Sequence, residues 1–168
     1  MSFKSFFSIS ESFDYTPEDI KKSEKNKGHE KDVEYEFHID GYEYSVLITI
    51  DNATKIASFI FAIIGDEFEN PLSIVGVGSS HKVFGAVANM FKRFTEEYRG
   101  EYKHIKFSAA KKDISRVRLY DRFMKNSFVS DNFDVDIDDR DMIKFYLLTP
   151  KSNDDTKNLQ EPRTMDVR

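Results

Sequence analysis

The chain has 168 residues, a formal net charge of −5, no cysteine and 39% hydrophobic residues. This length suits one domain with a sizeable core, the missing cysteines exclude disulfide scaffolds, thiol catalysis and thiolate metal sites, and the acidic balance argues against a generally basic nucleic-acid binder. The sequence contains neither the roughly 18 successive apolar residues that span a bilayer nor a secretory signal, so we expect a soluble, cytoplasmic protein.

Residues 1–31 are expected to form an extension ahead of the folded domain. The apolar residues around Phe3 and Phe6 indicate either a docking peptide or a terminal segment that packs on the sheet or stays disordered. Thr16 to Asp19 has the signature of a helix start, with Thr as the N-cap, Pro at the first helical position and a carboxylate at the third. Residues 21–31 (KKSEKNKGHEK) are rich in charge and predict a solvated linker.

Strict alternation of apolar and polar side chains starts at Val33. The alternation continues to Phe37, stops at the tight-turn pair Asp40-Gly41 and resumes from Tyr42 to Ile50, which predicts a β-hairpin. Residues 55–64 form a nearly continuous β-branched and aromatic run that suits a central strand. Three antiparallel strands are therefore expected here.

The next stretch predicts a β-α-β-α unit. Leu72–Val77 has the composition of a short strand, Gly78–Lys82 that of a small polar loop, and helical periodicity begins at Val83. His104–Ala109 predicts a second strand, parallel to the first because a helix connects them, and a second helix follows. The core side of that helix is expected to comprise Ile114, Val117, Leu119 or Tyr120, Phe123 and Met124. The loop lies at a helix N-terminus, where backbone N–H groups favour anions.

The C-terminal part predicts two further strands. Asp131–Asp141 contains six Asp residues, which suggests either a hard-cation site or one edge strand with its acidic side in water. We favour the edge strand, and predict no metal site. Met142–Leu148 is the expected final strand, the domain is expected to span residues 32–149, and residues 150–168 are expected to be a disordered tail.

This order of elements resembles the GNAT superfamily of N-acetyltransferases over roughly Val33 to Leu148. Two stretches carry the resemblance: residues 72–98 look like the family's acetyl-CoA-binding strand, loop and helix, and Ser115–Phe123 is similar to its Leu-Tyr-Glu-Lys helix. The implied fold is α/β (α+β): a mixed central sheet of about six to seven strands with two main helices and antiparallel N-terminal strands.

The resemblance also implies site residues. The family's loop wraps the pyrophosphate of acetyl-CoA with backbone amides, which assigns cofactor binding to Gly78, Ser79, Ser80, Lys82, Val83 and Gly85. The family's tyrosine protonates the departing thiolate, which assigns that catalytic role to Tyr120, whose other interpretation is a core-facing aromatic. The sequence does not identify a base for the amine, for which Glu67 or Glu69 is a candidate.

The sequence also departs from the family pattern. Ser79, Lys82 and Phe84 occupy the key loop positions, and a Phe84 side chain in that loop would obstruct the phosphates. These departures favour a non-catalytic GNAT-like domain that acts by protein contact, with an acyl-CoA-dependent N-acyltransferase as the alternative. Phe3 to Phe6 with Glu11 resembles the N-terminal peptide of phage head proteins, which suggests a bacteriophage accessory or virion-associated protein.

A second alternative is a nucleic-acid-associated protein. The second predicted helix and its flanks carry many cations: Lys111, Lys112, Arg116, Arg118, Arg122 and Lys125. The binding residues would be Arg116, Arg118 and Arg122, which could hold a nucleic acid, an acidic partner protein or the 3′-phosphate of CoA. The same residues also suit a solvated face paired with neighbouring acids.

Overall fold

The computed structural model describes residues 16–64 and 77–152, except for the side chains of residues 63 and 77–80. Several predictions lie outside the described residues: the docking peptide, the strand over residues 72–76, Glu67, Glu69 and the tail beyond residue 152.

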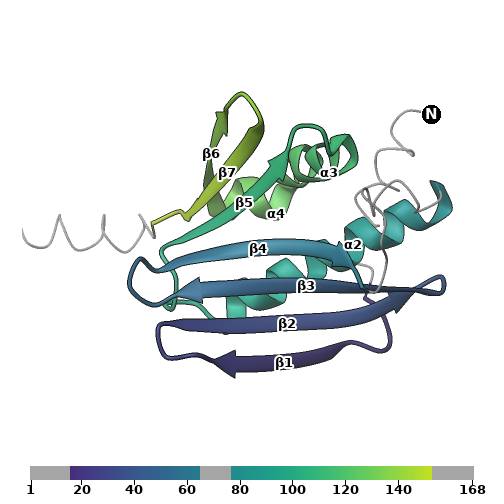
Figure 1. The fold of residues 1–168 in the computed structure, drawn as a ribbon, viewed down its shortest axis with the longest axis horizontal. Helices are drawn as coiled ribbons and strands as arrows, with labels where there is room; N and C mark the ends of the chain where they lie inside the picture. The colour runs from purple at the N-terminus through teal and green to yellow at the C-terminus, as the bar shows by residue number, and fades with distance from the viewer. Residues whose placement is uncertain (1–15, 65–76, 153–168) are drawn as a thin grey trace, which may run out of the picture.

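The described residues form a mixed sheet with helices (Figure 1). The elements are β1 (Lys21–Asn26), β2 (Glu30–Ile39), β3 (Tyr42–Asp51), β4 (Ile56–Ile63), α2 (Val77–Glu97), β5 (His104–Ala110), α3 (Ile114–Met124), α4 (Ser127–Asn132), β6 (Phe133–Asp139) and β7 (Ile143–Pro150). The seven strands lie in the order β1-β2-β3-β4-β5-β7-β6. Only the β4–β5 pair is parallel among these neighbours. The predicted α+β class, with antiparallel N-terminal strands and two main helices, is confirmed.

The β2–β3 hairpin forms as the sequence predicts. Asp40 and Gly41 have φ angles of 51° and 87°, the left-handed pair that a two-residue hairpin turn needs and that Asp and Gly tolerate. This turn sets the register in which Ile39 pairs with Tyr42. All the odd-numbered positions from Val33 to Ile39 therefore face the core, and each is at most 2% exposed.

One face of the sheet packs against the helices, and we call it the helix-covered face. Phe59 of β4 and Phe107 of β5 lie with their ring centroids 4.5 Å apart, and both contact Phe91 of α2 at 6.0 Å. Figure 1 shows α2 crossing behind β2, β3 and β4, while α3 and α4 lie beside β5, β6 and β7. The core is therefore an aromatic layer between the sheet and three helices.

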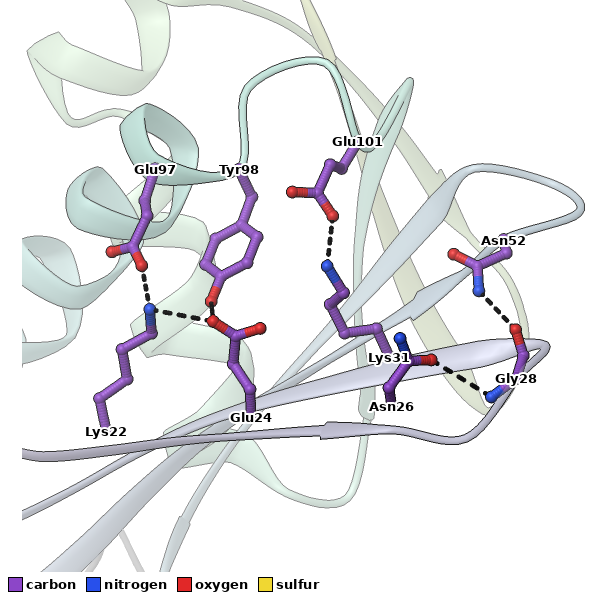
Figure 2. Close-up of polar contacts among 9 residues, drawn as sticks. All are labelled: Lys22, Glu24, Asn26, Gly28, Lys31, Asn52, Glu97, Tyr98 and Glu101. Atoms are coloured by element: carbon purple, nitrogen blue, oxygen red, sulfur yellow. Dashed lines mark hydrogen bonds and ion pairs between the residues drawn. The ribbon is translucent and has the colours of Figure 1, made fainter.

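Residues 21–31 are not a linker, contrary to the sequence prediction. Lys21–Asn26 is the edge strand β1, antiparallel to β2. Lys22 forms an ion pair with Glu97 of α2, and Lys31 of β2 pairs with Glu101 at 2.7 Å (Figure 2). Pairing with β2 satisfies one side of the β1 backbone, and these contacts with the end of α2 stabilise a segment that has almost no apolar surface of its own.

Tyr98 fixes the middle of β1 against α2. Its hydroxyl donates a hydrogen bond of 2.5 Å to Oε2 of Glu24 (Figure 2), and the Lys22 ammonium lies 4.9 Å from the centroid of the Tyr98 ring. The hydrogen bond from Tyr98 is the main cause that lowers the pKa of Glu24, because it favours the charged carboxylate.

Tyr98→Phe is expected to destabilise the protein more at about pH 7 than at about pH 2. The folded-state pKa of Glu24 is depressed, so its stabilising contribution is present above the unfolded-state pKa and is lost as the pH falls through the folded-state pKa. Urea unfolding of both proteins at the two pH values measures the effect. Equal losses at both values would assign the role of Tyr98 to ring packing alone.

Other local predictions are also corrected. Residues 18 and 19 form a turn and not a helix, because the Asp19 carboxylate instead accepts a hydrogen bond of 3.1 Å from the backbone N–H of His38. Asn126, just after the end of α3, is the N-cap of a further helix, α4, and accepts a hydrogen bond from the Phe128 N–H at 2.8 Å. Ile114, predicted to face the core, is 56% exposed at the first position of α3.

The acidic stretch forms an edge strand, as predicted. Strand β6 buries Phe133, keeps Asp134 and Asp136 exposed, and pairs with β7 along its inner side. In the described part of the chain, no three His, Asp or Glu side chains converge as a metal site would require.

Among the described residues, no helix combines the length and apolar character needed to cross a membrane.

Candidate active site

The parallel strands β4 and β5 pair over only part of their length. Their register runs from Ile56 with His104 to Ser58 with Lys106, although β4 continues to Ile63 and β5 to Ala110. Figure 1 shows the two strands diverging beyond this point. We call the region where they separate the β4–β5 divergence. Beyond it, the facing backbone edges of β4 and β5 are not hydrogen-bonded to each other.

The hydroxyl of Tyr120 lies at this divergence. Tyr120 is on α3, and its ring packs edge-on against Phe107 of β5 at 5.1 Å and Tyr146 of β7 at 5.9 Å. The Phe61 backbone on β4 lowers the Tyr120 pKa, as an N–H group close to the hydroxyl does. The side chain therefore reaches from β5 to the part of β4 that lies beyond the β4–β5 pairing.

Burial sets the protonation state of Tyr120. The side chain is 2% exposed, and desolvation raises its pKa to about 12, with smaller opposing effects from the Arg116 charge and the Phe61 backbone. A phenol with this pKa stays protonated throughout the neutral range. Tyr120 is thus suited to donate a proton rather than to accept one.

The neighbouring residue Asp121 positions α3 on the sheet. Its Oδ1 accepts a hydrogen bond of 2.7 Å from the Tyr146 hydroxyl and one of 2.9 Å from the Lys144 ammonium. Both partners belong to β7, which pairs with β5. These contacts, together with the ring contacts of Tyr120, fix the helix that carries the candidate acid.

The predicted loop over Gly78–Lys82 is helical, which corrects the sequence interpretation. Helix α2 begins at Val77, and Gly78, Ser79 and Ser80 belong to its first turn. Only the first four N–H groups of a helix lack an intrahelical acceptor. The backbone donors available for a phosphate are therefore those of residues 77–80, at the helix N-terminus.

The other predicted cofactor residues lie deeper in α2. Val83 and Gly85 are buried inside the helix, where their N–H groups bond to carbonyls four residues earlier. The Lys82 ammonium lies 3.3 Å from Asp40 Oδ1 in the β2–β3 turn. The N–H groups of Val83 and Gly85 are therefore not available to bind a phosphate, and Lys82 forms a surface ion pair.

Phe84 does not occupy the position that the sequence suggested. It is 1% exposed, packs against the Phe123 ring at 6.2 Å and lies under the guanidinium of Arg122 at 4.7 Å. Because it is a core residue of α2, it does not stand in a phosphate-binding loop. The steric objection to a cofactor at the helix N-terminus therefore disappears.

The predicted basic face of α3 is partly neutralised by its own neighbours. Arg116 Nε lies 3.5 Å from Oδ2 of Asp113, the N-cap of α3, and Lys111 pairs with Asp139. Arg122 packs over Phe84, whereas Arg118 is exposed. The three arginines thus have different surroundings, which weakens the case for a shared nucleic-acid surface.

Two hollows lie elsewhere in the described part of the molecule. One of about 420 Å³ lies between α2 and α4 and is lined by residues that include Asn89, Lys92 and Asp131. Another of about 690 Å³ lies near the end of α2, beside Arg99 and Lys151. Neither is lined by Tyr120 or by a residue of β4, so neither belongs to the candidate site.

The backbone N–H of Phe61 is the site group that the sequence did not indicate. This N–H has no β5 partner because the β4–β5 pairing ends at Ser58. The sequence of a strand does not show where its parallel partner diverges from it. Tyr120, in contrast, was predicted as a candidate acid or a core aromatic. Its side chain is buried in the core, and its catalytic role stays a prediction.

Comparisons with solved structures gave two similar chains. RimL, a ribosomal L7/L12 α-N-protein acetyltransferase, is similar with a TM-score of 0.43 and 10% identity, covering 76% of this chain and 73% of that chain. The N-acetyltransferase PseH of Campylobacter jejuni has a TM-score of 0.40 and 12% identity, covering 74% of this chain and 71% of that chain. No protein-family model and no curated protein matches the sequence.

Proposed function

We propose that the chain is an acyl-CoA-dependent N-acyltransferase that binds acetyl-CoA at the β4–β5 divergence. The observation that carries the proposal is the position of the Tyr120 hydroxyl, next to the Phe61 N–H where the two parallel strands separate. A buried proton donor beside an unpaired strand edge suits a reaction in which an extended substrate lies along that edge.

The geometry supports a division of roles along the bound cofactor. The pantetheine arm of CoA contains two amides, which can pair with the N–H and C=O groups of a free strand edge as a peptide does. Its pyrophosphate suits the first-turn N–H groups of α2 at residues 77–80. The thioester then lies near Phe61 and Tyr120.

Tyr120 supplies the proton for the leaving group. When the acceptor amine attacks the thioester carbonyl, the carbon–sulfur bond breaks and the sulfur leaves as a thiolate. The Tyr120 hydroxyl donates its proton to that sulfur, and its raised pKa keeps it protonated until then. The residues available for the amine's base, Glu67 and Glu69, lie outside the described residues.

This proposal reverses the preference for a non-catalytic domain. That preference came from the departures at Ser79, Lys82 and Phe84. The steric part of it falls away because Phe84 is buried in the core of α2. The bacteriophage role rests on residues 3–11, which lie outside the described residues, and it adds nothing to the site.

Acetyl-CoA is expected to stabilise the full chain against thermal unfolding. At 100 times its dissociation constant, a ligand that binds only the folded state adds about 2.7 kcal/mol. ATP, which has phosphates but no pantetheine arm, is the matched control and should give a smaller shift. Unchanged unfolding in millimolar acetyl-CoA would contradict the proposal, and an equal shift with ATP would indicate an anion site only.

A further inference from the structure

The sheet ends in two edge strands of opposite charge. Strand β1 lies at one end of the strand order and β6 at the other, and no described strand pairs with the outer side of either. The β1 sequence is KKSEKN and the β6 sequence is FDVDIDD. One edge is therefore basic and the other is acidic.

The opposite charges lie on the same face of the sheet. Lys22 pairs with Tyr35 and Val135 with Leu148, and both partners point to the helix-covered face. Because side chains alternate along a strand, the neighbouring positions point to the other face. That face carries Lys21 and Lys25 of β1, and Asp134, Asp136 and Asp138 of β6, all of them exposed.

The two edges also have compatible directions. Following the pairings from β1 to β6, with β4–β5 the only parallel step, places β6 antiparallel to β1. A second copy added in the same orientation would therefore continue the sheet with an antiparallel β6–β1 pair. The helix-covered faces of both copies would stay on the same side.

We propose that the chain associates with further copies of itself by pairing β6 of one copy with β1 of the next. This contact satisfies the outward backbone groups of both edges and places Lys21 and Lys25 opposite the aspartates of β6. Opposite charges directly across a strand pair are favourable. The aspartates of β6 that point to this face are two residues apart. Any register that keeps the helix-covered faces of the two copies on the same side therefore places a lysine of β1 next to an aspartate of β6.

The same charges oppose the symmetric alternatives. Pairing β6 with β6 places aspartates opposite aspartates, and pairing β1 with β1 places lysines opposite lysines, both of which are unfavourable. The contact is thus head-to-tail, and such a contact continues from copy to copy unless the rotation closes a ring.

Strand β1 is held in place as this interface requires. Lys22 and Glu24 point to the helix-covered face and contact Glu97 and Tyr98 at the end of α2 (Figure 2). Lys22 and Glu24 are therefore engaged within the molecule, whereas Lys21 and Lys25 on the opposite face stay exposed for a second copy.

The test is the mass of the full chain in solution as concentration rises at low salt. We expect the mass of the wild type to rise beyond that of a dimer, and added salt to reverse this. The double variant Asp134→Lys with Asp136→Lys should raise the dissociation constant by at least about tenfold. Its β1 edge is intact, so adding it to the wild type should shorten the assemblies by capping their free β6 ends.

A control variant has the same change in net charge, Glu18→Lys with Glu96→Lys, at exposed positions outside both edges. It should associate as the wild type does. The proposal is overturned if the wild type stays monomeric at millimolar concentration, if it stops at a dimer, or if the β6 variant associates as strongly as the wild type. Thermal unfolding of each variant confirms that it is folded.

Discussion

Tyr120→Phe is expected to lower the acetyl-transfer rate by about 100-fold to 10,000-fold, the range that a positioned general acid contributes. The substitution removes only the hydroxyl that lies against the Phe61 N–H and keeps the ring that packs on Phe107 and Tyr146. Cofactor binding should therefore change little. Steady-state rates with acetyl-CoA and an acceptor amine, together with the acetyl-CoA thermal shift of the variant, measure the two effects separately.

The same experiment distinguishes catalysis from packing. If Tyr120→Phe keeps the wild-type rate, the residue is a core aromatic and the proton comes from elsewhere. If the rate and the acetyl-CoA thermal shift are both lost, the hydroxyl acts in binding or folding. Tyr102→Phe is a matched control, because it removes the hydroxyl of another buried tyrosine, one that donates to the Thr95 carbonyl oxygen at 3.4 Å and takes no part in holding α3.

Phe91→Ala is expected to cost about 3–5 kcal/mol of unfolding free energy, the range for a phenylalanine deleted from a packed core. Phe91 is fully buried and lies at the centre of the aromatic layer. Its ring contacts those of Phe59, Phe107, Phe123, Phe128 and Phe133 at centroid distances of 5.0 to 6.3 Å. These partners belong to β4, β5, α3, α4 and β6. One side chain therefore joins the two halves of the sheet, β1 to β4 and β5 to β7.

Urea unfolding measures this loss. Phe91→Leu is the matched control and should cost less, because most of the apolar volume stays in place. A loss below about 1 kcal/mol for the alanine variant would show that the two halves of the sheet do not depend on this contact.

Local sequence patterns predicted the elements whose stability comes from near neighbours. The β2–β3 hairpin followed from strict alternation and from Asp40-Gly41, which adopt the left-handed angles that the turn requires. The helix α3 followed from the spacing of Val117, Tyr120 and Phe123. In these segments the apolar period and the turn chemistry point to one structure.

Elements that depend on distant partners were missed. Strand β1 has a charged sequence typical of a linker, and its stability comes from β2 and from Glu97 and Tyr98, more than 70 residues away. Helix α2 starts at Val77 although residues 78–80 are Gly-Ser-Ser, which are poor helix formers. Among the described residues, β5 lies between β4 and β7. Val77, the last residue of the strand predicted over residues 72–77, is helical.

The candidate site was half predictable for the same reason. The type and the helical position of Tyr120 indicated a catalytic or core role. The divergence of β4 from β5, which leaves Phe61 without a β5 partner, arises only from the three-dimensional pairing. The side-chain objection based on Phe84 failed because its position within α2, not its residue type, decides where its ring lies.

An NMR titration of the full chain with acetyl-CoA, followed at individual backbone amides, tests the proposed site most directly. We expect the largest shifts at Phe61, at the residues of β5 beyond Lys106 and at residues 77–80 of α2, because these N–H groups would contact the pantetheine arm and the pyrophosphate. Shifts confined to the hollow between α2 and α4, or no shifts at millimolar acetyl-CoA, would contradict the assignment of the β4–β5 divergence as an acyl-CoA site.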